Sequence, residues 1–206
     1  TRPTHNIGQV YVEPRKGSYS DPAVAGGGQI YCQVSHAAAY LSFLTGQRAA
    51  QVYARFERDG SPNDIYNALT LLLERGALVN IASTAATPLC ERNYEVRVFG
   101  SKAILQLELW HGTMALTDFA NRRTEFKPLA KDEVYPSQAP ALNFVDVILG
   151  RKPNGSPGTL GLAAMEIIEA ACESAQTNRC ETIRELEKRP GKRTRARRRA
   201  PVRQNA

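Results

Sequence analysis

The sequence predicts an α+β fold, in which helices pack on one face of an open, mostly antiparallel β-sheet. The chain has 206 residues, enough for one domain of ordinary size. Its middle contains short segments of alternating apolar and polar residues separated by short polar turns, which favour antiparallel pairing because parallel neighbours need long crossovers. Elsewhere, apolar residues recur at helical spacing, and helices grouped on one face of a sheet define the α+β class.

The first half of the chain predicts one helix and three strands. Apolar residues repeat at helical spacing over residues 34–44, and Gly46 follows where helices commonly end. A half-buried strand is expected over residues 49–56, where Val52, Ala54 and Phe56 alternate with polar neighbours. The apolar run 65–73 and the β-prone run 78–82 flank Glu74-Arg75-Gly76, which predicts a hairpin.

The second half predicts a meander followed by two helices. Strands are expected at 94–99, 104–109, 114–119 and 124–129, with turns at Gly100-Ser101, His111-Gly112 and Asn121-Arg122-Arg123. One helix is expected from Pro140 to Gly150, and another with Ser156 as its cap and Pro157 as its first residue. One sheet face then stays uncovered, and an apolar uncovered face favours a partner subunit.

The positive charge of the protein is concentrated at one end. Residues 184–206 hold ten basic and two acidic side chains, whereas the rest of the chain holds 17 basic and 18 acidic ones. We therefore expect a domain over residues 1–180 and a basic, disordered tail over residues 181–206, with one or two helical turns before Pro190. A nearly neutral fold makes nucleic acid an unexpected partner.

Composition also limits location and metal binding. The longest apolar runs fall short of eighteen residues, so no membrane-spanning helix is expected. The four cysteines and three histidines are scattered, without the spacing of zinc ligands. Reduced thiols in a cytoplasmic protein are the favoured interpretation, ahead of a disulfide framework.

The segment from Gly26 to His36 is the most informative for chemistry. Three consecutive glycines precede a predicted helix and give a backbone that can approach a ligand closely. We expect His36 in the first turn of that helix, where the helix dipole keeps an imidazole neutral and able to act as a general base. The alternative is a tight glycine turn followed by a structural histidine.

Several motifs follow in a fixed order: Gly26-Gly27-Gly28 before His36, a helix ending Leu44-Thr45-Gly46, and the strand and turn at residues 94–102. Two helices around Phe144-Val145-Asp146 and Ile167-Ile168-Glu169 complete the series. In this order and spacing the chain resembles, over roughly residues 7–179, the second domain of the Gfo/Idh/MocA family of NAD(P)-dependent oxidoreductases.

The resemblance implies the substrate-binding and oligomerisation half of such an enzyme, which transfers a hydride between NAD(P) and a hydroxyl of a sugar, cyclitol or related polyol. Family members also have an N-terminal Rossmann domain with a Gly-x-Gly-x-x-Gly loop and a Glu-Lys-Pro motif, and this sequence has neither. The expected partners are therefore a preceding Rossmann domain, the small-molecule substrate and further copies of the chain. NAD or NADP is expected in the full-length enzyme and not on this chain alone.

The resemblance also suggests site residues. The family pattern Asp-x-x-x-His falls on Cys32 and His36, which makes His36 the expected catalytic residue and leaves cysteine in place of aspartate. The expected substrate-binding residues are Lys16, Tyr19, Cys32, Gln33 and Ser35. The alternatives are packing for Cys32, helix capping for Gln33 and Ser35, and an ordinary surface loop for Lys16 and Tyr19.

Two further interpretations stay open at this point. Trp110 and His111 lie at an expected hairpin tip, where a subunit contact is at least as favoured as a ligand contact. The missing aspartate at Cys32 also favours a rival function for the whole chain, a non-catalytic binding or assembly module that keeps the fold.

Overall fold

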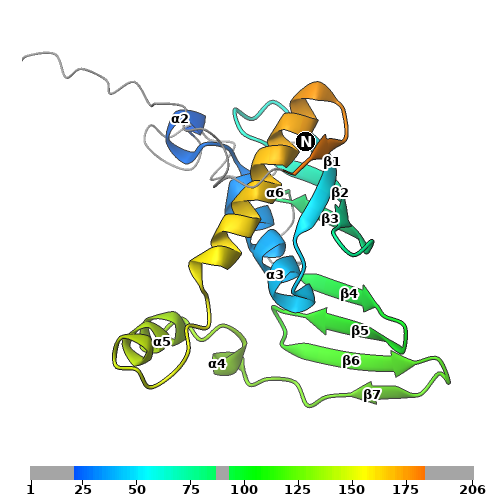
Figure 1. Cartoon of the computed structure of the whole chain (residues 1–206), viewed down its shortest axis with the longest axis vertical. Coiled ribbons are helices and arrows are strands. Elements are labelled where there is room, and N and C mark those ends of the chain that lie inside the picture. Colours follow the sequence, from blue (N-terminus) through cyan, green and yellow to red (C-terminus); the bar gives the residue numbers. More distant parts are fainter. Residues whose placement is uncertain (1–20, 87–92, 184–206) are drawn as a thin grey trace, which may run out of the picture.

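The computed structural model describes residues 21–86 and 93–183, and it confirms the α+β class (Figure 1). The described helices are α2 (Pro22–Ala25), a π-helical segment η1 (Ile30–Val34), α3 (Ser35–Thr45), α4 (Lys131–Val134), α5 (Ala139–Ile148) and α6 (Gly158–Thr177). The described strands are β1 (Ala49–Glu57), β2 (Tyr66–Leu73), β3 (Leu78–Thr84), β4 (Glu95–Phe99), β5 (Ala103–Glu108), β6 (Thr113–Asp118), β7 (Arg123–Glu125) and β8 (Glu181–Thr182).

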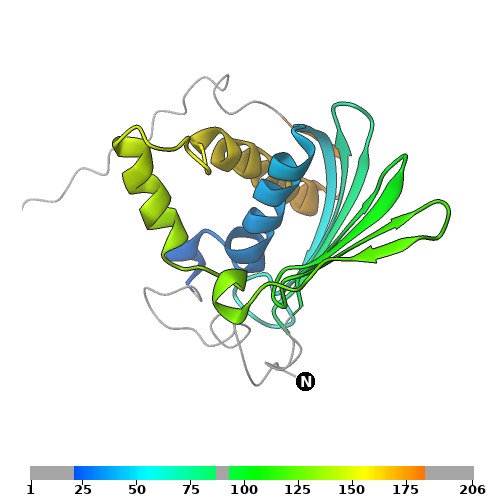
Figure 2. The same ribbon diagram turned by 90° about the horizontal axis from the view of Figure 1, so that it is seen from below.

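The strands form two open antiparallel sheets, where the sequence predicted one. The first has the order β3-β2-β1-β8 and the second the order β4-β5-β6-β7. Over the described residues, no ladder of hydrogen bonds joins β3 to β4, and this divides the sheet. Figure 2 shows the strands fanning into a curved layer with α3 and α6 on one side of it.

The main core lies between the first sheet and the two longest helices. Val52 and Ala54 of β1 are fully buried while Tyr53 and Arg55 are exposed, as the alternation of the sequence predicted. The opposing apolar surface comes mainly from α6, η1 and α3, through Ile167, Ile168, Ala171, Ile30, Val34 and Ala38. Burying this surface is the dominant favourable term in folding.

Four details differ from the sequence prediction. The last strand of the meander is only Arg123–Glu125, and the four-residue helices α2 and α4 were not predicted. Pro157 is the N-cap of α6 and not its first residue. Glu181 and Thr182 pair with β1, so the sheet continues past residue 180, where a helical turn was expected. Residues 184–206, the rest of the expected tail, lie outside the described residues.

The two sheets differ in the character of their partly exposed surfaces. In the second sheet, two neighbouring rows across β4, β5 and β6 are apolar: Val96, Leu107 and Met114, then Val98, Leu105 and Leu116. We call these six residues the apolar face of the second sheet; all remain half-buried or exposed. The first sheet instead exposes a row of Arg55, Ala68 and Ala82. Among the described strands, two adjacent rows of large apolar side chains on a partly exposed face are found in the second sheet.

Candidate functional site

The glycine turn before η1 is shaped by close contact with the segment that precedes β2. Gly26 has φ +80°, in the region that favours glycine. A Cβ on Gly28 would lie 2.2 Å from the backbone oxygen of Asp64 and 2.8 Å from Cβ of Asn63. Only glycine fits at residue 28 without a shift of the backbone.

The carboxylate of Asp64 caps the helix that follows this turn. Its Oδ1 accepts a hydrogen bond from the backbone N–H of Gly28 at 2.8 Å, and its Oδ2 accepts from the N–H of Ile30 at 2.7 Å. The side-chain amide of Asn67 donates to Oδ2 at 2.8 Å. No local pattern in the sequence points to Asp64, because this cap comes from a segment more than thirty residues further along the chain.

The helix that contains His36 therefore begins earlier than predicted. Gln29, Val34 and Ser35 all have right-handed helical dihedral angles, so η1 and α3 form one continuous helical run that begins near Gln29. His36 lies almost two turns into this run, and the prediction that it occupies the first turn was wrong. The helix dipole acts mainly within the first turn, so the sequence argument that placed it at His36 does not hold.

His36 lies exposed on the helical run, and its side chain has no hydrogen-bond partner within the described residues. Cys32, Gln33 and Tyr40 are three or four residues away, so their side chains occupy neighbouring positions on the helix surface. These side chains and His36 form one patch, from which the imidazole is free to meet a ligand.

The other expected site residues have mixed surroundings. Cys32 is half-buried and packs against the small cluster of Ile65 and Ala85. The hydroxyl of Ser35 donates to the backbone oxygen of Tyr31 one turn earlier, and its oxygen can still accept a hydrogen bond. Gln33 is half-buried, whereas Lys16 and Tyr19 lie outside the described residues.

A second thiol lies behind the helical run. Burial raises the pKa of the Cys172 thiol to about 11, although a hydrogen bond with Tyr31 opposes this effect. The thiol is therefore protonated near neutral pH and is a poor nucleophile. Within the described residues, no group of three or more acidic, histidine or cysteine side chains could hold a metal ion.

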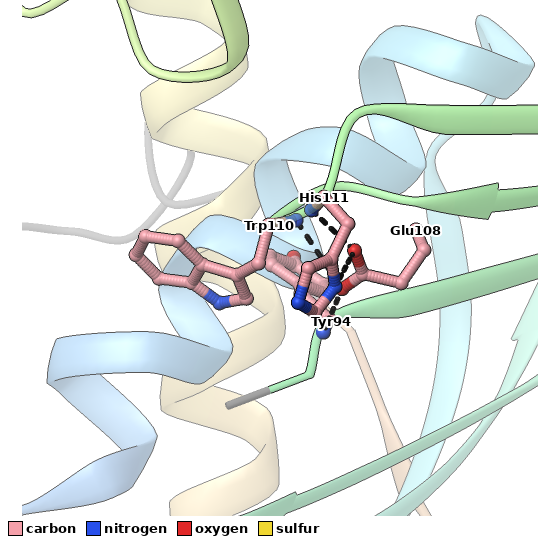
Figure 3. A network of polar contacts seen from close by, with 4 residues as sticks. All are labelled: Tyr94, Glu108, Trp110 and His111. Carbon is pink, nitrogen blue, oxygen red and sulfur yellow. Dashed lines mark hydrogen bonds and ion pairs between the residues drawn. The ribbon is translucent and has the colours of Figure 1, made fainter. Parts of the chain in front are cut away.

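A polar network surrounds Glu108 at the end of β5 (Figure 3). Its carboxylate accepts hydrogen bonds from the backbone N–H groups of Tyr94 at 2.8 Å, of Trp110 at 3.2 Å and of His111. Nδ1 of His111 lies 2.6 Å from the same carboxylate. Burial opposes ionisation of Glu108, but the backbone N–H groups and the His111 side chain together hold its pKa below the usual value.

Comparison with known proteins identifies the family. The profile of the GFO/IDH/MocA C-terminal domain matches residues 4–106, half of the chain. The chain belongs to the Gfo/Idh/MocA family. No curated protein matches it significantly. None of the helices in the described part of this family member is long and apolar enough to cross a membrane.

Solved structures of oxidoreductases share the fold. A provisionally named NADPH-dependent oxidoreductase from Desulfitobacterium hafniense superposes with a TM-score of 0.68 at 22% sequence identity. This match covers 85% of the present chain and 54% of the oxidoreductase. The aldose-aldose oxidoreductase of Caulobacter crescentus superposes with a TM-score of 0.67 at 20% sequence identity. This match covers 83% of the present chain and 52% of the oxidoreductase. The WlbA dehydrogenase of Bordetella pertussis, solved with NADH and UDP-GlcNAcA, superposes with a TM-score of 0.58 at 20% sequence identity. This match covers 77% of the present chain and 46% of the dehydrogenase. The chain thus spans about half the length of these oxidoreductases.

Proposed function

We propose that this chain is the substrate-binding half of an NAD(P)-dependent oxidoreductase that acts on a hydroxyl of a sugar, cyclitol or related polyol. The observation that supports this most directly is His36, an exposed imidazole without a partner in the described residues, at the position to which the family resemblance of the sequence assigns a catalytic histidine. Members of similar fold include an aldose-aldose oxidoreductase and a dehydrogenase solved with NADH and a nucleotide sugar.

His36 serves this reaction as the group that receives the hydroxyl proton. The nicotinamide cofactor, when bound to the other half of the enzyme, supplies the acceptor for the hydride that leaves the carbinol carbon. A ring nitrogen of His36 accepts the proton of the hydroxyl as the carbonyl forms, and it returns the proton in the reverse direction. An unpartnered imidazole can reach a substrate hydroxyl without first breaking a contact with the protein.

The remaining proposed contacts surround His36. Gln33 and Cys32 occupy neighbouring positions on the same helical run, and Ser35 keeps acceptor capacity on its hydroxyl oxygen. Lys16 and Tyr19 are proposed as further substrate-binding residues from the segment before the glycine turn. The proposed location is the cytoplasm, in keeping with the free thiols of Cys32, Cys172 and Cys180.

The second candidate function is a non-catalytic binding or assembly module. It is favoured by Cys32, which stands where the family pattern has aspartate and packs against Ile65 and Ala85. The two functions differ in what they expect of His36, because a module without catalysis needs no proton acceptor. Turnover of the His36→Ala variant of the full-length enzyme decides between them.

The isolated chain is expected not to bind NAD(H) or NADP(H) at micromolar concentrations. A pyrophosphate is normally held by free N–H groups of a glycine-rich turn at a helix N-terminus. Here Asp64 occupies the N–H groups of Gly28 and Ile30, and its negative charge repels a phosphate at this turn. The glycine turn therefore does not fit the cofactor.

Titration calorimetry of the chain with both cofactors tests this expectation, with the full-length parent protein as the positive control. Micromolar affinity of the chain for either cofactor would contradict it and would require a dinucleotide site within these 206 residues.

Self-association through the apolar face of the second sheet is a further expectation. Apolar rows on an open face favour a partner subunit, because association removes them from water. Leu116 is 37% exposed near the middle of this face, so Leu116→Glu is expected to convert an oligomer to monomers. The matched control is Thr70→Glu, at an exposed position of β2 in the first sheet. Sedimentation experiments measure the oligomeric state of the wild-type chain and of both variants. A wild-type chain that is monomeric at tens of micromolar would count against the interface.

A further inference from the structure

The turn between β5 and β6 holds an imidazole in a defined orientation. Because Nδ1 of His111 lies 2.6 Å from the Glu108 carboxylate, this nitrogen carries the ring hydrogen. Nε2 then points away from Glu108 and is left to make a hydrogen bond with another molecule. The His111 side chain is 67% exposed, so this nitrogen is open to solvent.

An aromatic surface lies beside this imidazole. The rings of Trp110 and Tyr135 are stacked, with centroids 6.0 Å apart and an angle of 28° between their planes. Tyr135 is 73% exposed and Trp110 40% exposed. A Cβ on Gly112 would lie 2.7 Å from Cγ2 of Val134, so the turn fits tightly against α4 just before Tyr135. This contact brings the end of α4, and with it Tyr135, against the turn that carries Trp110.

The stability of the fold does not require this arrangement. Glu108 already accepts three backbone N–H groups without the imidazole. The His111 side chain is largely exposed, so its contact with Glu108 adds little to stability. The Trp110–Tyr135 stack is also partly exposed, so burial of these rings stabilises the fold less than burial in the core would. Ligand sites typically combine exposed aromatic rings with a few positioned polar groups, as the Trp110–Tyr135 stack and His111 do here.

A saccharide ring matches these features. The C–H groups on one face of a sugar ring form an apolar surface that can lie on an aromatic ring. Its hydroxyl groups project from the edge of the ring and can donate a hydrogen bond to an imidazole nitrogen. The Trp110–Tyr135 stack supplies the first contact, and Nε2 of His111 supplies the second.

Side-chain contacts connect this turn with the helical run that carries His36. The backbone N–H of Tyr94 donates to Glu108, and the ring of Tyr94 meets that of Tyr40 edge to face, with centroids 5.9 Å apart. Tyr40 is one turn after His36 on α3. The turn and His36 therefore border the same region of the molecule.

We propose that Trp110, Tyr135 and His111 bind a second saccharide ring, one that is linked to the ring oxidised next to His36. The substrate is then a glycoside or disaccharide and not a single free ring. This inference rests on the proposed function, since it extends the substrate class of the same enzyme.

The single tryptophan of the chain provides a direct test. Trp110 is the only one of its kind in the sequence, so the intrinsic tryptophan emission of the chain reports on this turn alone. Titration with maltose, cellobiose and lactose is expected to change the emission saturably for at least one of them. The affinity is expected to exceed that for glucose by about tenfold or more, the scale of one good hydrogen bond together with apolar contact.

Variants separate the two contacts. His111→Ala and Tyr135→Ala are each expected to weaken disaccharide binding by about tenfold, a scale set by one lost contact. Both side chains are largely exposed, so the melting temperature is expected to stay unchanged. Thr70→Glu, at an exposed position of the first sheet and outside both contacts, is the control, with emission and affinity at this turn as in the wild type.

Three results would overturn the inference: no saturable change with any of the disaccharides, equal affinity for glucose and the disaccharides, or emission that follows protein concentration instead of saccharide. The last result would make the aromatic stack a subunit contact. The titration needs neither cofactor nor turnover. Its failure is therefore distinguishable from a failure of the proposed function, which shows in the turnover of the His36 variant.

Discussion

Gly28→Ala is expected to lower the free energy of unfolding by about 3 kcal/mol, the upper part of the range for overpacking a tight site. The added Cβ would lie 2.2 Å from the backbone oxygen of Asp64. Since the atom in its way is backbone, relief requires the glycine turn and the segment before β2 to move apart. That movement also lengthens the hydrogen bonds from Gly28 and Ile30 to the Asp64 carboxylate.

Urea denaturation measures the loss, and Gly161→Ala is its matched control. Gly161 lies in α6 with no atom within 4 Å of an added Cβ, and its φ is not positive. Alanine there is expected to leave stability unchanged or to raise it by up to about 1 kcal/mol, the difference in helix propensity. Equal stabilities of the two variants would show that the contact between Gly28 and Asp64 does not define the turn.

Elements whose signal is local could be predicted from the sequence. The alternation of Val52 and Ala54 gave β1 its buried face, and Gly76, with φ +87°, closes the hairpin between β2 and β3. Gly46 takes the left-handed conformation directly after α3, as expected of a helix C-terminus. In each case the deciding residues are within a few positions of one another.

Features that depend on distant residues could not be predicted. The start of the helical run depends on Asp64, a cap supplied by another segment. Glu166 is almost fully buried in α6 and accepts two hydrogen bonds from the Arg48 guanidinium, which is 118 residues away in sequence. A buried carboxylate needs such a partner, but its identity follows only from the packing of α6 beside β1.

The candidate site divides in the same way. His36 was identified through its position in a family pattern, whereas its exposure and its depth in the helix required the structure. Trp110 and His111 were recognised as a hairpin tip. The orientation of His111 by Glu108 and the stacking of Trp110 on Tyr135 join residues from different elements, and no local pattern reveals them.

In the full-length enzyme, His36→Ala is expected to lower turnover by roughly a hundredfold or more, the usual scale for a general acid–base group. Since His36 is exposed and makes no hydrogen bond within the described residues, its removal should leave the melting temperature nearly unchanged.

Cys32→Ser is the informative companion to this variant. Cys32 packs against Ile65 and Ala85, so serine is expected to lower the melting temperature. Turnover should change only mildly if Cys32 merely packs, whereas an intermediate loss of turnover would indicate the proposed contact with the substrate. Measuring melting temperature and turnover on the same samples then gives opposite patterns for the two neighbours. A His36→Ala enzyme with near-normal turnover and reduced stability would remove His36 from the mechanism. It would favour the binding module, because proton transfer is the one property of this patch that a module without catalysis does not need.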